Sequence, residues 1–241
     1  MEANVVIFTP HLDDAVFSCW HVLDSERAVS VVNVFAGVPP PGTPLTRWDR
    51  ITGASDPASR VSERIEEDRL ALALAGREPT NLPFVEAQYR DGKPTLDEVL
   101  PPIREHVSGD EALVVPAGIG GHSAHCLIRD AGLTLLGEGV AVSFYADIPY
   151  ATEFGWPAWV SGIALEPFVN VDAAWSEALE PIEAAGCEPR VVQFDDDAQR
   201  RKAAAMRTYR TQFAALEADG QQRLTRPELI GFEVAWSRPI S

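Results

Sequence analysis

The chain has 241 residues and a formal net charge of −16, from 20 basic and 36 acidic side chains. A surface of this charge repels nucleic acid and anionic membranes, so we expect neither as a partner and favour a neutral or cationic small molecule. Three cysteines without a C-x-x-C pattern indicate reduced thiols. Because neither a signal-peptide pattern nor a run of about 18 apolar residues occurs, we expect a cytoplasmic protein with one domain over residues 1–241. The sequence leaves open whether it forms a homo-oligomer.

The first elements predict a parallel β-α-β unit. Residues 4–8 and 28–36 are rich in β-branched residues and indicate buried strands, with apolar residues at helical spacing between them. Residues 37–59 are rich in Pro, Gly and Ser and predict an irregular loop, which at this length is more often functional than idle. A helix is expected at 60–76, with Glu66, Glu67 and Asp68 on its solvated face.

The later elements continue the alternation of strands and helices. We expect a helix at 97–107 broken near Pro101, a strand at 111–118, a helix at 125–137, a strand at 140–148, an irregular segment at 149–159, a strand near 160–171, a long helix near 197–218 and a short strand at 232–238. This order predicts a Rossmann-like three-layer α/β sandwich with a mostly parallel sheet. In such folds ligands bind at the carboxyl ends of the strands.

Two polar clusters follow predicted strands at that edge. His11, Asp13 and Asp14 end the first strand, and His122 and His125 follow a later one. Adjacent carboxylates repel each other and are costly to hold together unless a cation offsets them. Imidazole and carboxylate ligands suggest zinc, with three protein ligands and a fourth position left for water. Spacing alone does not decide which aspartate or which histidine is a ligand.

A structural interpretation stands beside the metal site. Two aspartates after a strand are often a helix N-cap pair that the helix dipole stabilises. In that case the chain would be a structural α/β domain that binds no metal and has ordinary carboxylate pKa values.

The sequence resembles the zinc-dependent N-deacetylases of the PIG-L/LmbE-like family. The likeness rests on "TPHLDDAVFSC" and "GIGGHSAHCLIRDA", and the pieces "RIEEDRLALALAG", "AQYRDG", "YADIPYA" and "KAAAMRTYRTQ" extend it over most of the chain. The family's first motif is usually Pro-His-Pro-Asp-Asp-Glu, and a subset carries Pro-His-Leu-Asp-Asp-Ala, as here.

The resemblance implies a role for each residue of the two motifs. His11, Asp14 and His125 would hold one Zn²⁺ per chain. Asp13 would be the general base. His122 would stabilise the oxyanion or protonate the leaving amine.

The resemblance also implies a substrate. The expected reaction removes an N-acetyl or other small N-acyl group from an amino sugar, in a glycoconjugate or in a specialised metabolite such as an antibiotic. Composition rich in Ala, Asp, Arg and Pro, with lysine only at Lys93 and Lys202, is typical of a GC-rich bacterial source. We expect Trp48, Arg90, Asp147 and Tyr150 to contact the substrate. The loops at 37–59 and 149–159, with Trp156 and Trp159, are expected to cover the site.

Ala124 departs from the family's usual His-x-Asp-His motif. An aspartate at this position would orient His122 and favour its imidazolium form. We expect Asp147, at the next strand end, to take over this role. The alternative is a degenerate member that binds a sugar or metabolite without hydrolysing it.

Overall fold

A computed structural model of the chain describes residues 4–107, 111–163, 168–217 and 224–239. Within these residues one seven-stranded sheet has the order β3-β2-β1-β4-β5-β7-β6. Its strands are β1 (Val5–Thr9), β2 (Val29–Asn33), β3 (Pro79–Asn81), β4 (Ala112–Pro116), β5 (Val142–Tyr145), β6 (Glu188–Gln193) and β7 (Phe232–Ser237). Strands β1 to β5 pair in parallel, whereas β7 is antiparallel to both β5 and β6. The predicted mostly parallel sheet is confirmed.

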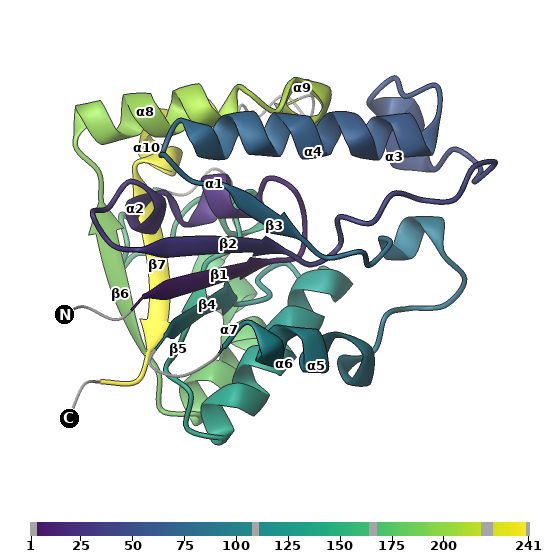
Figure 1. Cartoon of the computed structure of the whole chain (residues 1–241). Helices are drawn as coiled ribbons and strands as arrows, with labels where there is room; N and C mark the ends of the chain where they lie inside the picture. The colour runs from purple at the N-terminus through teal and green to yellow at the C-terminus, as the bar shows by residue number, and fades with distance from the viewer. Residues whose placement is uncertain (1–3, 108–110, 164–167, 218–223, 240–241) are drawn as a thin grey trace.

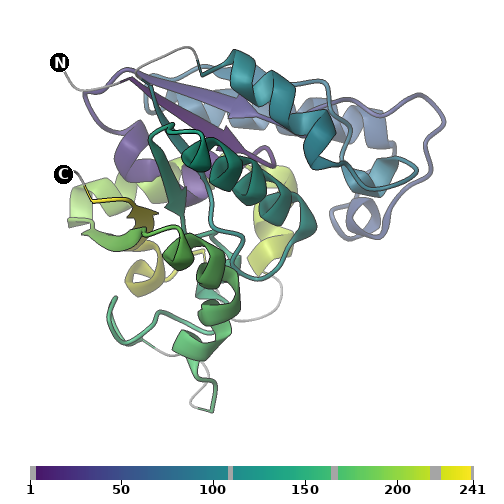
Figure 2. The same ribbon diagram turned by 90° about the horizontal axis from the view of Figure 1, so that it is seen from below.

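Helices cover both faces of the sheet and complete a three-layer sandwich. They are α1 (Asp14–Ser18), α2 (Trp20–Leu23), α3 (Arg47–Ile51), α4 (Pro57–Ala73), α5 (Leu96–Glu105), α6 (Ser123–Gly137), α7 (Val171–Ala184), α8 (Asp196–Met206), α9 (Arg210–Glu217) and α10 (Pro227–Ile230), with 3₁₀ turns η1 (Ala87–Tyr89) and η2 (Tyr150–Thr152). In Figure 1, α4, α8 and α9 lie above the sheet and α5, α6 and α7 below it. Figure 2 shows the lower layer from beneath.

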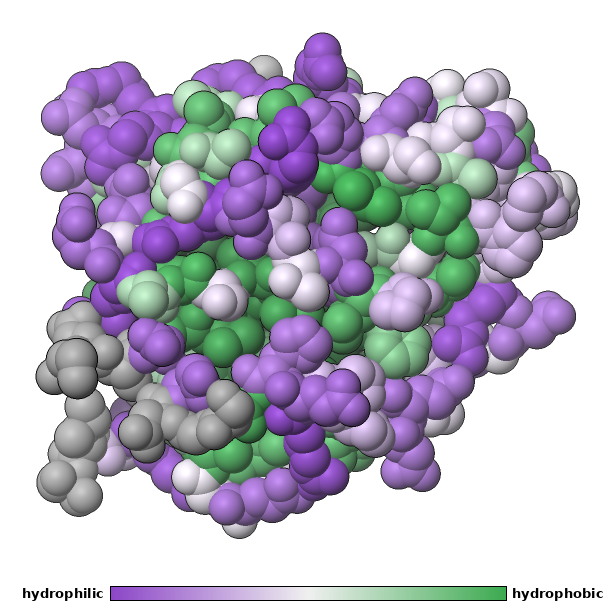
Figure 3. Space-filling model, in the orientation of Figure 1, coloured by the Kyte–Doolittle hydropathy of each residue, from purple (hydrophilic) through white to green (hydrophobic). Residues whose placement is uncertain are grey.

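The central strand β1 is buried along its whole length. All five of its residues are buried, and Ile7 and Phe8 have no exposed surface. A parallel strand with helices on both faces must be apolar on both faces, which explains the unbroken apolar run. Figure 3 shows one face of the molecule, where hydrophobic residues gather in a band across the middle and hydrophilic residues predominate around it.

The helical segment after β1 divides at Cys19 into α1 and α2. The Glu233 carboxylate of β7 accepts hydrogen bonds from the backbone N–H groups of Trp20 and His21 at 2.8 and 3.0 Å. It also accepts one from Lys202 Nζ at 2.7 Å. An anion at a helix N-terminus satisfies N–H groups that have no partner inside the helix. A residue more than 200 positions away therefore starts α2.

Several predicted elements were wrong. The strand expected near 160–171 does not form: residues 160–163 are turn and coil, residues 168–170 are not extended into a strand, α7 begins at Val171, and 164–167 lie outside the described residues. Helix α5 continues through Pro101, and the long helix expected at 197–218 is divided at 207–209, with residue 218 outside the described residues. Strands β3 and β6 and helix α3 were not predicted, because short or exposed elements carry little apolar periodicity. Helix α7 was also missed, although its buried Val171, Trp175, Leu179 and Ile182 follow a helical period.

Three neighbouring strand ends define one edge of the sheet. Strands β1, β4 and β5 are adjacent and parallel, so the residues that follow Thr9, Pro116 and Tyr145 emerge side by side. The turn after β4 requires glycine at Gly120, where φ is +84° and an added Cβ would lie 2.7 Å from Cβ of Tyr150. This turn brings the start of α6 over the end of β1.

Candidate metal centre and active site

His11, Asp14 and His125 meet at this edge. His11 Nδ1 lies 3.2 Å from His125 Nε2 and 3.5 Å from Asp14 Oδ2. His125 Nε2 lies 3.6 Å from Asp14 Oδ1. His125 and Asp14 are buried, and His11 is partly exposed. Residues more than a hundred positions apart thus form one cluster of three potential ligands.

The cluster fits a divalent metal ion. Zinc held tetrahedrally by nitrogen and oxygen at about 2.0–2.2 Å places its ligand atoms about 3.3–3.6 Å apart. The separations among the three side chains lie close to that range. His122 provides a second way to complete a site, because ring nitrogens of His11, His122 and His125 all lie within 4.8 Å of one another.

The adjacent aspartates do not act as a helix-cap pair. Asp13 occupies the N-cap position of α1 but its side chain makes no capping hydrogen bond. Asp14 instead accepts a hydrogen bond at 2.8 Å from the backbone N–H of His11 through Oδ2. Burial favours the neutral acid, but His125 and the hydrogen bonds from His11 outweigh it and lower the pKa of Asp14 to about 2. Asp14 is therefore held as a carboxylate facing the two rings.

Asp147 orients His125 rather than His122. Its Oδ1 lies 2.7 Å from His125 Nδ1, and its Oδ2 accepts the backbone N–H of Ile119 at 2.9 Å. A carboxylate on one ring nitrogen fixes the tautomer and turns the other nitrogen toward a metal. Against the effect of burial, Asp14 and Asp147 raise the pKa of His125 to about 9, because their charges favour a cation in this position. The expected contact between Asp147 and His122 was wrong.

His122 faces the cavity without a polar partner in the described part of the chain. Its Nδ1 is buried and makes no hydrogen bond. Its ring stacks on Tyr150, with centroids 5.6 Å apart and an interplanar angle of 25°. Burial and the nearby rings of His11 and His125 lower the pKa of His122 to about 4, so the ring is neutral at pH 7. A neutral imidazole offers one N–H as a hydrogen-bond donor.

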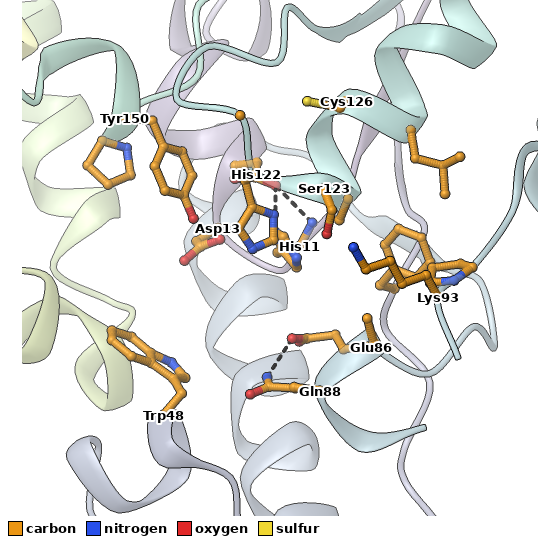
Figure 4. Close-up of a pocket in the computed structure, with 18 of the residues that line it drawn as sticks. His11, Asp13, Trp48, Glu86, Gln88, Lys93, His122, Ser123, Cys126 and Tyr150 are labelled. Atoms are coloured by element: carbon orange, nitrogen blue, oxygen red, sulfur yellow. Dashed lines mark hydrogen bonds and ion pairs between the residues drawn. The ribbon is translucent and has the colours of Figure 1, made fainter. Parts of the chain in front are cut away.

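Asp13 lies beside the cluster on the wall of the cavity (Figure 4). Burial and the adjacent Asp14 charge raise its pKa to about 7, against the opposing charges of Arg64 and His11. A carboxylate with a pKa near neutrality has the proton affinity that a general base needs at pH 7.

One cavity of about 700 Å³ opens above these residues. This volume is in the range of pockets that enclose small-molecule ligands. The lining includes His11, Asp13, His122, Tyr150 and Trp48. Figure 4 shows Tyr150 and the histidines on one side, with Trp48, Glu86 and Gln88 across from them.

Four residues expected at the site lie elsewhere. Arg90 is absent from the cavity lining, and its guanidinium pairs with Glu98 at 3.0 Å. Trp156 is buried and donates its indole N–H to the backbone oxygen of Leu229, so it anchors its loop to the core. Trp159 packs edge-on against Trp175 and Trp236. Asp147 is likewise fully buried behind His125 and outside the cavity lining.

The charged face of α4 was missed. Glu67 and Asp68, expected on a solvated face, are 4% and 1% exposed. Arg64 lines the cavity and pairs with Glu86 at 2.7 Å. The sequence did contain a signal for this burial. At the helical period, the buried apolar residues Val61, Ala71 and Leu72 lie on the same face of α4 as residues 60, 64, 67 and 68.

Known proteins share both this fold and parts of this sequence. No protein-family model matches the chain. The 2'-N-acetylparomamine deacetylase of Niallia circulans is 28% identical over 185 residues, 60% of this chain and 66% of that protein. The enzyme of the same name from Streptomyces fradiae is 30% identical over 175 residues, 62% of this chain and 58% of that protein. Both of these proteins are named as deacetylases, and this chain is similar to them in sequence.

Solved structures of this type cover almost the whole chain. A triple mutant of a deacetylase of teicoplanin biosynthesis has a TM-score of 0.74 at 24% identity, and the zinc-inhibited form of teicoplanin deacetylase has 0.72 at 22%. Each comparison covers 98% of this chain and 97% of the other, so this chain shares the fold of these deacetylases. The chain spans two thirds or less of the length of the two curated relatives.

Among the described residues no helix has the length and apolar character needed to span a membrane.

Proposed function

We propose that this chain is a metal-dependent hydrolase that removes an N-acetyl group from an amino sugar of a specialised metabolite. The observation that carries the proposal is the triangle of His11, Asp14 and His125, with separations of 3.2 to 3.6 Å, beside Asp13 on the cavity wall. The net charge of −16 suits a cationic aminoglycoside, the class that the names of the two curated relatives describe. The substrate is then an N-acylated amino sugar of a bacterial antibiotic.

His11, Asp14 and His125 would hold one Zn²⁺ per chain. When bound, such an ion supplies Lewis acidity toward the amide carbonyl and lowers the pKa of water. His125 is positioned for this role by Asp147, whose carboxylate occupies its Nδ1 and leaves Nε2 directed at the other two ligands. Imidazole and carboxylate ligands with a position left for water are typical of catalytic zinc, and zinc is therefore the ion to test first.

Asp13 would accept the proton of the attacking water. Its side chain is free of a capping role and lines the cavity next to His11. His122 would donate a hydrogen bond to the carbonyl oxygen as negative charge develops there, a contribution typical of oxyanion-hole donors. The products are the acyl acid and the free amine. Residues 1–241 would act as a single domain.

Metal content and acetate release test the proposal together. The purified protein should contain about one zinc per chain by mass spectrometry and should release acetate from 2'-N-acetylparomamine. Chelation should abolish turnover and zinc should restore it. Asp14→Ala should lose the metal, whereas the matched variant His122→Ala should keep it and lose turnover. Zinc-loaded protein that hydrolyses no N-acetyl amino sugar would contradict the proposal.

Ala124 motivates a second candidate, a member that binds its ligand without hydrolysing it. The carboxylate usual in the motif is missing, and within the described residues no group replaces it on His122 Nδ1. The variant Ala124→Asp separates the two functions. A wild type that binds zinc but gains activity only with Ala124→Asp is a binding protein; a wild type already active is a hydrolase.

A further inference from the structure

The His122 side chain is surrounded by aromatic rings rather than by hydrogen-bond partners from the described residues. It occupies the N-cap position of α6 but makes no capping hydrogen bond, and its buried Nδ1 has no polar partner. The rings of His11 and His125 meet it edge-on, with centroids 4.9 and 5.2 Å away at 80° and 81°. Tyr150 instead stacks on its face, at 5.6 Å and 25°. The Tyr150 ring therefore limits rotation of the His122 ring.

Tyr150 is fixed in place from both sides of this contact. It begins η2, and the next residue, the buried Ala151, donates its backbone N–H to the backbone oxygen of Asp147 at 2.7 Å. Gly120 lies two residues before His122 and lets the two segments approach, because an added Cβ there would lie 2.7 Å from Cβ of Tyr150. Figure 4 shows Tyr150 beside His122 on the cavity wall. The stacked pair is thus built into the backbone of both segments.

We propose that Tyr150 is a positioning residue whose aromatic ring orients His122 in place of the carboxylate that the chain lacks at Ala124. The inference rests on the proposed deacetylase function, in which His122 donates a hydrogen bond to the substrate carbonyl. A carboxylate orients an imidazole through a ring nitrogen, whereas a stacked ring fixes the plane of the imidazole. Stacking also adds no negative charge near the carbonyl oxygen, where negative charge develops during the reaction.

Kinetics of three variants separate the Tyr150 ring from its hydroxyl. Tyr150→Leu removes the stack and should lower kcat for 2'-N-acetylparomamine about 10-fold or more at unchanged zinc content, because misplacing a catalytic group by about 1 Å can cost about 100-fold. Tyr150→Phe keeps the ring and should retain kcat within about threefold, with any lost contact of the hydroxyl appearing in KM. Trp159→Leu is the matched control, since the Trp159 ring packs on Trp175 and Trp236 instead of His122, and its kcat should stay within about twofold.

Crystal structures of the metal-free protein measure the orientation of His122 without turnover. In the wild type and Tyr150→Phe the ring should keep one conformer, with its centroid near 4.9 and 5.2 Å from those of His11 and His125. In Tyr150→Leu it should rotate or occupy more than one conformer. Adding Ala124→Asp to Tyr150→Leu should raise kcat at least about fivefold, because a carboxylate then orients the ring.

Four results would overturn the proposal. An equal loss of kcat in Tyr150→Phe and Tyr150→Leu assigns the effect to the hydroxyl. Loss of zinc in Tyr150→Leu assigns the ring to the support of His125, which it meets edge-on at 5.3 Å. An unchanged His122 conformer in Tyr150→Leu, or no gain from Ala124→Asp in that variant, would show that the ring does not orient His122. Displacement of His122 in Tyr150→Leu, together with a zinc-loaded wild type that releases no acetate, contradicts the hydrolase function alone.

Discussion

Two pairs of adjacent acids, Asp13–Asp14 and Glu67–Asp68, look alike in the sequence and have different surroundings in the fold. Asp14 faces two histidines, and Asp13 has no hydrogen-bond partner among the described side chains. Asp68 instead accepts hydrogen bonds at 2.7 Å from Tyr209 and from Asn33, both buried. Glu67 accepts two from Thr211. The first pair lies open to a cation and a ligand, whereas neutral donors close off the second.

The difference shows two ways to meet the cost of burying carboxylates. Hydrogen bonds to neutral donors compensate Asp68 only in part, because burial still raises its pKa to about 6. The Asp14 carboxylate is favoured as an anion by the histidines beside it. Because Tyr209 and Asn33 already donate hydrogen bonds to Asp68, its carboxylate oxygens leave no position for a ligand. The second pair therefore stabilises the contact of α4 with the segment around Tyr209, and the first pair is available for chemistry.

The largest effect is expected at Asp13. Asp13→Asn should lower kcat by about 10²–10⁴, the usual contribution of a general base, with zinc content unchanged. Asp68→Asn should leave kcat within a fewfold of wild type. Steady-state kinetics with metal analysis measures both. Loss of zinc in Asp13→Asn would reverse the roles assigned to Asp13 and Asp14.

The support of the metal cluster is tested at Asp147. Asp147→Asn removes the charge on His125 Nδ1 and leaves the Ile119 N–H without its acceptor. Zinc affinity should fall about 10- to 100-fold, the typical effect of losing such a partner. Competition with a chromogenic chelator measures it. Unchanged affinity would show that ring orientation does not depend on this carboxylate.

The contribution to stability of the hydrogen bonds around Glu67 and Asp68 is tested at Tyr209. Tyr209→Phe removes one donor to Asp68 and should destabilise the fold by about 1–3 kcal/mol, the cost of leaving a buried acceptor unsatisfied. Denaturant unfolding of both proteins at pH 7.5 measures the change. Tyr145→Phe serves as a control, because the Tyr145 hydroxyl is buried and has no hydrogen-bond partner in the described structure. A larger loss in the control would contradict the role of Tyr209.

The smallest effect is the pH dependence that Asp68 contributes. Its pKa is raised in the folded state from 3.8 to about 6, so the folded protein binds a proton that the unfolded chain releases. The contribution to stability is fully present below the unfolded pKa and is lost as pH rises through 6. Wild type should lose about 1 kcal/mol more stability than Asp68→Asn between pH 5 and pH 7.5. Equal changes in unfolding free energy would show that the Asp68 pKa is not raised.

Local pattern predicted that the two histidine motifs meet at one edge of the sheet, whereas the choice of His11, Asp14 and His125 within them came from the family resemblance. The two histidine motifs follow strands, and adjacent parallel strands end at one edge, so the meeting of His11 with His125 was predictable. Asp147 was expected at the same edge. Whether its carboxylate contacts His122 or His125 depends on a few ångströms in the placement of helix α6. The helical period of α4 places its charged residues on the buried side of the helix. They were nevertheless expected to be exposed, because charged residues are rarely buried.

The sequence by itself determined the alternation of strands and helices, the parallel centre of the sheet and the two motifs at its edge. These features depend on apolar periodicity and on residue types close together in the chain. Only the tertiary structure decided which carboxylate faces the two histidines, which one accepts hydrogen bonds from Tyr209 and Asn33, and where Glu233 divides α1 from α2. A buried charge takes its partners from whatever segment packs against it, and those segments lie from 35 to 213 residues away.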